Sequence, residues 1–422
     1  MRDIGGTFSS TPERGHRPRV YGRMFATDFV TRLKVPMMVT RVICGLLLML
    51  ASFLSATLSA AELSPAIKAI QSLGKEGADN QAASRAFAAL SQAPLEELPQ
   101  LLSGLDEANP LGANYLRGAV DVIVDRAIRA KAPVPTNLLE TFIRDTSHSP
   151  RARRLAFEVL TRFDAATPDR LVPSFLNDPS TELRRDAVQR LIDQGKKELG
   201  DEKDAAAKQL AAKTLAAAFA SARDIDQIEQ LAKDLKKLEV TVDLPRHFGF
   251  VMNWKLIGPF DNTGESAFDV AYPPEREIRL DATYPGKGDK SVAWIDHQTT
   301  HEHGMVDFNK ALGKANGVTG YAYTEFEAKQ NQTVDIRTGC ICACKVWVNG
   351  QLVDGHNVYH SGTRVDQYIC RAPLKAGKNT ILVKVLQNEQ EQNWAQDWQF
   401  QLRICDATGT AILSTDRLAS TP

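Results

Sequence analysis

The sequence predicts a multidomain α plus β protein, with an N-terminal α-helical solenoid or bundle followed by a C-terminal β-sandwich. Residues 62–242 are rich in Ala and Leu, and their apolar residues recur at helical spacing. Residues 243–422 show an apolar period of two, with frequent Gly and Pro between short runs. Asn349-Gly350 stands between two such runs, which is a strong signal for a β-hairpin. We therefore expect one domain of each kind, with the boundary between residues 242 and 243.

Residues 1–61 predict an upstream segment and a signal peptide. A second candidate start lies at Met37 or Met38. A basic residue, an apolar stretch and a small-residue cleavage site then follow, at Arg41, Ile43–Leu54 and Ser59-Ala60-Ala61. The apolar stretch is short for a membrane span, which takes about 20 residues, so an uncleaved membrane anchor is the weaker alternative. We expect a periplasmic or secreted chain with no membrane span after cleavage.

The charge of the expected mature chain argues against nucleic acid as a partner. Residues 62–422 hold 43 basic and 48 acidic side chains, a net charge of −5. They contain no basic run and no basic–aromatic stripe, and binding to a phosphate backbone depends on such clusters.

Ten segments with helical periodicity predict a stack of short helices. They run over about 64–75, 80–92, 94–106, 111–130, 135–146, 150–163, 167–176, 180–194, 204–222 and 224–239. Helix ends are predicted where a polar residue precedes a proline and at one glycine. These positions are Asn109-Pro110, Ser149-Pro150, Thr167-Pro168, Asp178-Pro179 and Gly195.

A weak internal repeat lies within these helices. Arg153–Leu160 aligns with Arg184–Leu191 at an offset of 31, and each copy has an Ala four residues before a Leu. The segment Asn177–Ala187 resembles the second-helix signature of HEAT-type repeats. The resemblance implies an α-solenoid, which would offer a surface for protein docking, and a plain helical bundle is the alternative.

Eight runs of alternating residues predict the strands of a sandwich. They are Met252–Ile257, Tyr321–Ala328, Thr333–Arg337, Cys344–Val348, Gln351–Val353, Gln367–Cys370, Thr380–Leu386 and Trp398–Cys405. In the last of these the apolar residues predict a core face, and the residues between them predict a face that meets water, namely Gln399, Gln401 and Arg403.

The two-residue turn at Asn349-Gly350 fixes the register of its hairpin. We expect three cross-strand pairs, Val348 with Gln351, Trp347 with Leu352 and Val346 with Val353. Apolar pairs on both faces predict that the hairpin is buried. The tryptophans that lie within strand patterns are assigned to the core, namely Trp254, Trp347 and Trp398.

Residues 321–404 resemble the galactose-binding-like jelly roll, in particular the sugar-binding-type domain of glycoside hydrolase family 2 enzymes. In that family a V-W-V-N-G-x-x-V hairpin precedes L-K-x-G-x-N-T, and the matching positions are Val346–Val353 and Leu374–Thr380. Asn253–Phe260 is similar to the start of such domains in secreted multidomain bacterial proteins. Because these residues are turn and core positions, the resemblance implies a fold more directly than a function.

One segment departs from the pattern of the secreted relatives. They often read G-S-D-D-G before the hairpin, where this chain has Gly339–Ala343 without any carboxylate. Calcium needs several oxygen ligands, so this segment gives no support for a structural calcium. We expect no cofactor.

Five cysteines lie in the β region. Cys340, Cys342 and Cys344 form a cluster in which side chains two apart on a strand point to one face. In an exported chain Cys370 or Cys405 could form a disulfide with one member of this cluster. The alternative is that the clustered cysteines are small core residues, and the sequence does not decide between the two.

A metal site is a further hypothesis for the β region. His301 and His303 would share one face of a strand, which is a reasonable start for metal ligation. The alternative is a polar connection between strands, because the spacing fixes no third ligand.

A shallow glycan site is expected on the loops at one end of the sandwich. Trp394 lies in a very polar connection where burial is difficult, and sugars stack on exposed aromatic rings. The polar loop 354–360 could approach the same end, so we expect Trp394 to act with Tyr359, His356 and Asn357.

No motif in the sequence predicts catalysis. It lacks a G-x-S-x-G elbow, an H-E-x-x-H pair and a phosphate-binding glycine loop. We expect a non-enzymatic exported protein whose sandwich binds carbohydrate or another cell-envelope polymer and whose helices dock a protein. The alternatives are a structural module of a cell-envelope complex without a sugar ligand and, third, an unrecognised glycoside hydrolase.

Overall fold

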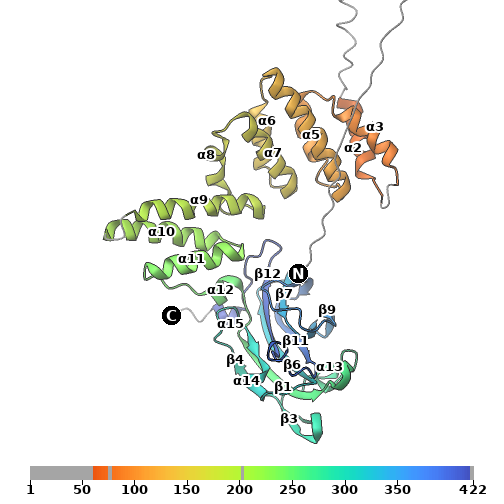
Figure 1. Cartoon of the computed structure of the whole chain (residues 1–422), viewed down its shortest axis with the longest axis vertical. Coiled ribbons are helices and arrows are strands. Elements are labelled where there is room, and N and C mark those ends of the chain that lie inside the picture. Colours follow the sequence, from red (N-terminus) through yellow and green to blue (C-terminus); the bar gives the residue numbers. More distant parts are fainter. Residues whose placement is uncertain (1–59, 75–77, 201–203, 419–422) are drawn as a thin grey trace, which may run out of the picture. The chain divides into compact units, whose positions relative to one another are not determined.

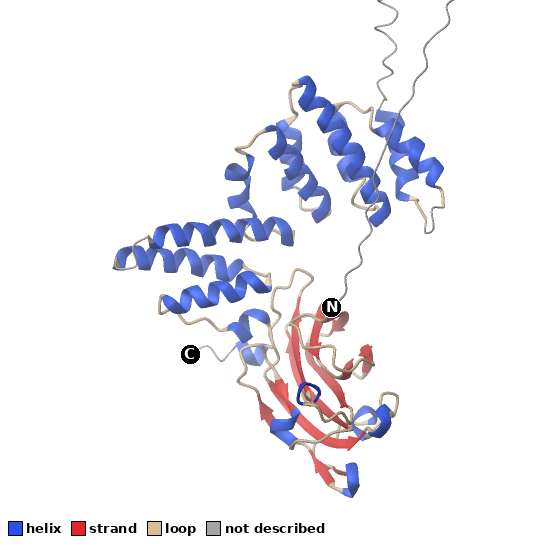
Figure 2. Ribbon diagram, viewed as in Figure 1, coloured by secondary structure: helices blue, strands red, loops and turns tan. Residues whose placement is uncertain are grey.

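The computed structural model describes residues 60–74, 78–200 and 204–418 (Figures 1 and 2). The predicted signal peptide lies outside these residues except for its last two positions, and so do both candidate starts. Contacts between residues place 58–422 in one compact unit, and the expected division at residues 242 and 243 stays a prediction. None of the helices in the described part of the chain is long and apolar enough to cross a membrane.

The N-terminal half consists of helices, as predicted. They are α2 (Ala60–Gln71), α3 (Asn80–Leu90), α4 (Leu98–Ser103), α5 (Pro110–Ala130), α6 (Thr136–Arg144), α7 (Pro150–Phe163), α8 (Thr167–Leu171), α9 (Thr181–Leu199), α10 (Ala205–Ser221), α11 (Ile225–Lys237) and α12 (Leu244–Phe248). Asn109 and Ser149 cap the starts of α5 and α7, and a proline follows each cap. These polar–proline pairs therefore begin helices as well as separating them.

Gly195 does not end a helix, contrary to the prediction. It lies inside α9, which continues to Leu199. A Cβ atom built on Gly195 would lie 2.8 Å from Leu215 of α10. The glycine is therefore explained by the close approach of two helices, and helix termination is not its role.

The 31-residue repeat is visible in the contacts of its arginines. The first arginine of each copy is buried, and its Nε donates a hydrogen bond to a backbone carbonyl. Arg153 donates to Ile143 at 2.7 Å, and Arg184 donates to Asp178 at 2.8 Å. The second arginine of each copy reaches an acid two helices further along the chain. Arg154 of α7 pairs with Asp186 of α9, and Arg185 of α9 pairs with Asp226 of α11 at 2.6 Å. Equivalent positions thus make equivalent contacts, which a stack of repeats would require. The HEAT-like solenoid stays a prediction.

The C-terminal half contains two antiparallel sheets. Its strands are β1 (Asn253–Asp261), β2 (Thr283–Pro285), β3 (Ser291–Ala293), β4 (Ile295–Gln298), β5 (Val306–Asp307), β6 (Val318–Ala328), β7 (Gln332–Cys340), β8 (Ala343–Val348), β9 (Gln351–His356), β10 (Tyr368–Leu374), β11 (Gly377–Gln387) and β12 (Gln399–Cys405). One sheet has the order β4-β1-β6-β11-β8-β9 and the other β10-β7-β12-β5, while β2 and β3 form a separate pair. Two short helices stand between strands, α13 (Pro273–Arg276) and α14 (Phe308–Leu312), and α15 (Thr415–Leu418) follows the last strand.

A single apolar core joins the two sheets. It includes Leu256 and Val383 from the six-stranded sheet and Ile336 and Leu402 from the four-stranded sheet, all of them buried. The α plus β class and the β-sandwich are thus confirmed, and the jelly-roll topology stays a prediction. Strands β2 to β5 were not predicted, because they have only two to four residues each and lack a clear alternation.

The Asn349-Gly350 turn forms as predicted, and the register beyond it differs. Both residues have positive φ, 52° and 78°, and Val348 pairs with Gln351 and Trp347 with Leu352. A bulge follows, so that Val346 lies opposite Asp354 and the expected pair with Val353 does not form. The hairpin is not buried on both faces either, since β9 is an edge strand and Leu352 is 50% exposed.

Two of the three tryptophans assigned to the core lie there. Trp254 and Trp398 are buried between the sheets. Trp347 is only half-buried, because it packs beside Leu382 on the outer face of the six-stranded sheet.

The outward face of β12 does not meet water at Gln401 and Arg403, contrary to the prediction, and Gln399 is partly exposed. Gln401 and Arg403 are buried because the segment 361–367 covers this face of the four-stranded sheet. Ser361 donates to the Cys340 carbonyl at 3.2 Å. Gln367 accepts from the backbone N–H of Cys340 at 3.1 Å. Polar residues therefore alternate along a strand that is covered on both sides.

We expect Gly339→Ala to displace this covering segment. A Cβ atom at Gly339 would lie 2.3 Å from the Arg364 carbonyl oxygen, so the segment must move, at a cost of about 1–3 kcal/mol. Trypsin should then cut faster after Arg364, which limited proteolysis with mass spectrometry would show. Gly355→Ala is the control, since its added carbon would make only ordinary contacts, the nearest at 3.4 Å. Equal cleavage in both variants would contradict the prediction.

Candidate functional site

Four loops meet at one end of the sandwich, where β1, β9 and β11 finish and β6 begins. Their backbones are bonded to one another, since Asn262 N donates to the Gly317 carbonyl and Gly317 N donates to the Asn388 carbonyl, each at 2.8 Å. We name this region the Trp394 loop cluster and define it by Asn262, Gly317, Tyr359, His360, Asn388 and Trp394. The loop 354–360 reaches the connection around Trp394 through its last residue, His360, while a ligand site there stays a prediction.

Trp394 is the exposed aromatic residue of this cluster. Its side chain is 63% exposed and lies in a short 3₁₀ helix, Asn393–Ala395. The edge of the indole meets the His360 ring, with the ring centres 5.1 Å apart and the planes at 78°. Gln387 donates to the Ala395 carbonyl at 2.6 Å and so fixes the loop from below. The indole is therefore held in place while it still presents its surface to solvent.

His360 connects Trp394 to a buried anchor. Its Nε2 lies 3.1 Å from Oδ1 of Asn388, a residue that is almost fully buried. The other end of the Asn388 amide donates to Glu265 at 3.0 Å. The imidazole orientation is thus set by a hydrogen bond on one side and by the indole contact on the other.

Tyr359 lies beside His360 and is half-buried. Its hydroxyl oxygen accepts a hydrogen bond from Asn262 Nδ2 at 3.2 Å. Burial raises the pKa of Tyr359, against the lowering effect of that hydrogen bond. The phenol is therefore neutral at physiological pH, and its own proton is available for a ligand acceptor.

The structure does not bring His356 to Trp394. The His356 ring stacks on Tyr368 of β10, with the centres 3.6 Å apart, and its Nε2 lies 2.9 Å from Asp354. Asn357 is exposed on the loop that follows. The histidine against the indole is His360, which sequence reasoning missed although it ends the same polar loop. Its φ of 58° is a local turn geometry that strand alternation does not predict.

Both acidic and basic residues surround the Trp394 loop cluster. Glu389 accepts a hydrogen bond from Gly264 N, and Lys287 donates to the Gly317 carbonyl at 2.6 Å. Lys287 also lies 3.2 Å from Asp261, whose pKa is lowered mainly by the hydrogen bond from Thr263 and further by Lys287. These groups hold the loops together and leave Trp394 as the large apolar surface among polar neighbours.

His301 and His303 lie in a turn before β5, and the metal hypothesis stays a prediction. Their ring centres are 5.9 Å apart. His301 Nδ1 accepts a hydrogen bond from the His303 backbone at 3.1 Å, and His303 Nε2 lies 3.6 Å from Glu229. Within residues 60–74, 78–200 and 204–418, no three His, Cys, Asp or Glu side chains are arranged to hold a metal ion.

The three clustered cysteines do not share one strand. Cys340 ends β7 and Cys344 belongs to β8, so the chain crosses from one sheet to the other between them. All three are buried in the core, as the small-residue alternative expects. All five cysteines of the β region are free thiols in the structure, and burial raises the pKa of Cys370 to about 12 and that of Cys405 to about 11. The disulfide stays a prediction.

No family model matches the chain, and no curated protein matches it. Among solved structures, a β-glucosidase from Kluyveromyces marxianus in complex with glucose is similar at 10% identity and a TM-score of 0.23, over 39% of this chain and 17% of that one. A glycosyl hydrolase family 2 member from Bacteroides cellulosilyticus is similar at 14% identity and a TM-score of 0.23, over 37% and 20%.

A carbohydrate binding module is also among the structural neighbours. The family 35 carbohydrate binding module from Clostridium thermocellum is similar at 19% identity and a TM-score of 0.14, over 21% of this chain and 72% of the module. This chain spans about a fifth of the length of the two enzymes. The structural neighbours are thus glycoside hydrolases and a carbohydrate-binding module, at values too low to assign a function.

Proposed function

We propose that the protein is an exported, non-catalytic binding protein whose sandwich recognises carbohydrate through the Trp394 loop cluster. The observation that carries the proposal is the indole of Trp394, which is 63% exposed and yet fixed in orientation by His360. In the same proposal the helical repeats act as a docking scaffold for a protein of the cell envelope.

A fixed and exposed indole suits a sugar for two physical reasons. The apolar C–H face of a pyranose stacks on an aromatic ring, and a ring that is already held in place loses little entropy on binding. Tyr359 lies beside His360, which contacts the indole, and its hydroxyl group can bond to the sugar hydroxyls. The resemblance of Val346–Val353 to a sugar-binding-type domain points to the same ligand class.

A second candidate function is an assembly module of a cell-envelope complex without a sugar ligand. It is favoured by exposed apolar side chains on two of the edge strands, Leu352 of β9 at 50% and Ile369 of β10 at 55%. A third candidate, a glycoside hydrolase, would be favoured only by turnover of a glycan by the mature chain.

We expect Trp394→Ala to weaken binding of the mature chain to polysaccharide by about tenfold. One aromatic stacking contact is worth roughly 0.5–1.5 kcal/mol beyond the area that it buries, and a tenfold change corresponds to about 1.4 kcal/mol. Affinity electrophoresis in gels that contain neutral plant and bacterial polysaccharides measures the effect. Leu352→Ala is the control, since it removes another exposed apolar side chain outside the cluster. Retardation that is equal in the wild type and in Trp394→Ala would rule out this binding surface.

A further inference from the structure

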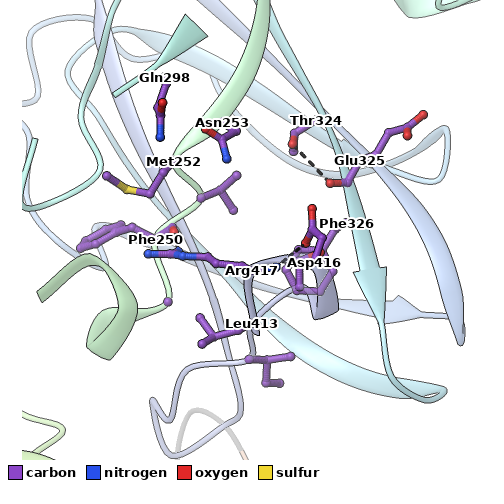
Figure 3. Close-up of a pocket in the computed structure, with 14 residues that line it drawn as sticks. Phe250, Met252, Asn253, Gln298, Thr324, Glu325, Phe326, Leu413, Asp416 and Arg417 are labelled. Carbon is purple, nitrogen blue, oxygen red and sulfur yellow. Dashed lines mark hydrogen bonds between the residues drawn. The ribbon is translucent and has the colours of Figure 1, made fainter. Parts of the chain in front are cut away.

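A separate pocket opens at the other end of the sandwich. It lies where the C-terminal segment 411–417 crosses the start of β1 and the far part of β6 (Figure 3), and its volume is about 370 Å³. The strands β1 and β11 run away from this end and finish at the Trp394 loop cluster. The two regions are therefore at opposite ends of the same strands.

The pocket has an apolar base and a rim of neutral hydrogen-bonding groups. Phe326 and Leu413 contribute to the base. Asn253 of β1 and Gln298 of β4 are cross-strand neighbours on the rim, and Figure 3 shows both amides turned toward the pocket. Neither amide has a hydrogen-bond partner within the described part of the chain. The Thr324 hydroxyl on β6 donates to the Glu325 carbonyl at 3.4 Å and adds a further acceptor.

The charged groups of the pocket already have partners. Glu325 lies 2.7 Å from Lys378, whose hydrogen bond is the main cause of the lowered pKa of Glu325. Arg417 donates to the Phe250 carbonyl, and Asp416 accepts from the Arg417 backbone at 2.8 Å. The hydrogen-bonding capacity that remains open is mainly that of the neutral amides.

We propose that this pocket binds a neutral polyhydroxylated ligand, a sugar ring or a short oligosaccharide. Each carboxamide both donates and accepts, which matches vicinal hydroxyl groups, while the apolar base suits the C–H face of a ring. The volume falls within the range of roughly 300–1,000 Å³ that is usual for ligand pockets. Glu325 is paired with Lys378, and Asp416 and Arg417 carry opposite charges, so the lining offers no excess charge that would favour an ionic ligand.

A second hollow extends the pocket along the sheet. Its volume is about 310 Å³, and it shares Asn253, Thr324 and Glu325 with the first. It continues beside Tyr323 and Lys255 on β6 and β1. The two hollows together give room for more than one sugar ring, which favours an oligosaccharide over a single monosaccharide.

The test uses the mature chain with Trp394→Ala as the parent, so that it does not depend on the proposed function at the other end. Neutral gluco-, manno- and galacto-oligosaccharides are titrated by calorimetry. The parent should bind one of them, and adding Asn253→Ala with Gln298→Ala should weaken binding about tenfold or more, because two hydrogen-bonding side chains are lost. Adding Gln351→Ala, another exposed amide on a strand, should change nothing.

A second variant and an acidic probe complete the experiment. Thr324→Tyr should abolish binding by filling the pocket while both amides remain, and an unchanged thermal transition shows that a variant is folded. The proposal is overturned if the parent binds none of the neutral oligosaccharides, if the double variant binds as tightly as the parent, or if oligogalacturonides bind more tightly than neutral chains.

Discussion

Replacement of Lys384 by Met is expected to lower the free energy of unfolding of the sandwich by about 3–5 kcal/mol. The Lys384 side chain is fully buried on the outer face of the six-stranded sheet, beneath the segment 267–275. Its Nζ donates to the carbonyls of Ala267 and Val270 and to the Glu275 carboxylate, each at 2.8 Å. Met has a similar length and offers no donor, so the largely buried Glu275 carboxylate would lose its counter-charge and the carbonyls of the segment 267–270 would lose their donor.

Urea unfolding followed by tryptophan fluorescence measures this loss. All five tryptophans lie between Trp254 and Trp398, so the signal reports the β region alone. Lys345→Met is a matched control, because Lys345 lies directly opposite Lys384 on the neighbouring strand and its partner Asp269 is 88% exposed. Asp269 can return to water when its partner is removed, so the control should lose much less. Equal losses in both variants would contradict the assigned role of the buried pair.

The double variant Lys384→Met with Glu275→Leu separates the contribution of the Lys384–Glu275 ion pair from that of the backbone carbonyls around Lys384. Removal of both charges leaves no buried ion without a partner, so part of the stability should return. Tyr321 donates its hydroxyl proton to Glu275 as well, and this bond would also be lost. A double variant as unstable as Lys384→Met would mean that the backbone carbonyls carry most of the effect.

The strand that contains Lys384 was predicted from the sequence, but the buried contacts of its side chain could not be. The run 380–386 alternates as a strand should, and a lysine in it is usually a residue that faces water. The segment that covers Lys384 lies more than a hundred residues earlier in the chain. Local periodicity carries no information on such a contact. The polar residues Gln401 and Arg403 were assigned to water for the same reason.

Elements with local signals were predicted well. The helix predicted at 150–163 has these bounds in the structure, because Ser149 caps it and Pro150 opens it. The Asn349-Gly350 turn formed for an equally local reason, its need for positive φ. The bulge at Val353, three residues after Gly350, has no such local signal, and it placed Asp354 opposite Val346.

The candidate site was predicted only in part, because only some of its features have a local signal in the sequence. The polarity around Trp394 correctly indicated an exposed aromatic residue, since a loop with so many amides and acids has little to bury an indole. The choice between His356 and His360 depended on the course of the loop. His356 still belongs to β9 and stacks on Tyr368 of the other sheet, whereas His360 follows the turn back toward Asn388.

Asp366→Asn is expected to destabilise the sandwich by about 3–5 kcal/mol near neutral pH. Asp366 binds the buried Arg403 through two hydrogen bonds of 2.6 and 2.5 Å and also accepts from Arg337 at 2.8 Å. Arg403 donates further to the Phe248 carbonyl at 3.0 Å, so the guanidinium also holds the chain that enters β1. Asn keeps the size of the side chain and removes its charge, which leaves Arg403 buried without a carboxylate.

The same variant should show a pH dependence of known sign. Burial would raise the pKa of Asp366, but the hydrogen bonds from Arg403 and Arg337 outweigh it and hold that pKa below its ordinary value. The stabilisation is therefore complete above the pKa of an unfolded aspartate, about 3.9, and is lost as the pH falls through the lower pKa of the folded state. The gap between wild type and Asp366→Asn should be widest near neutral pH and should narrow in acid. Asp296→Asn, at a side chain that is 86% exposed, serves as the control and should change little at either pH. A gap of constant size across the acid range would contradict the role assigned to the Asp366 charge in the stability of the fold.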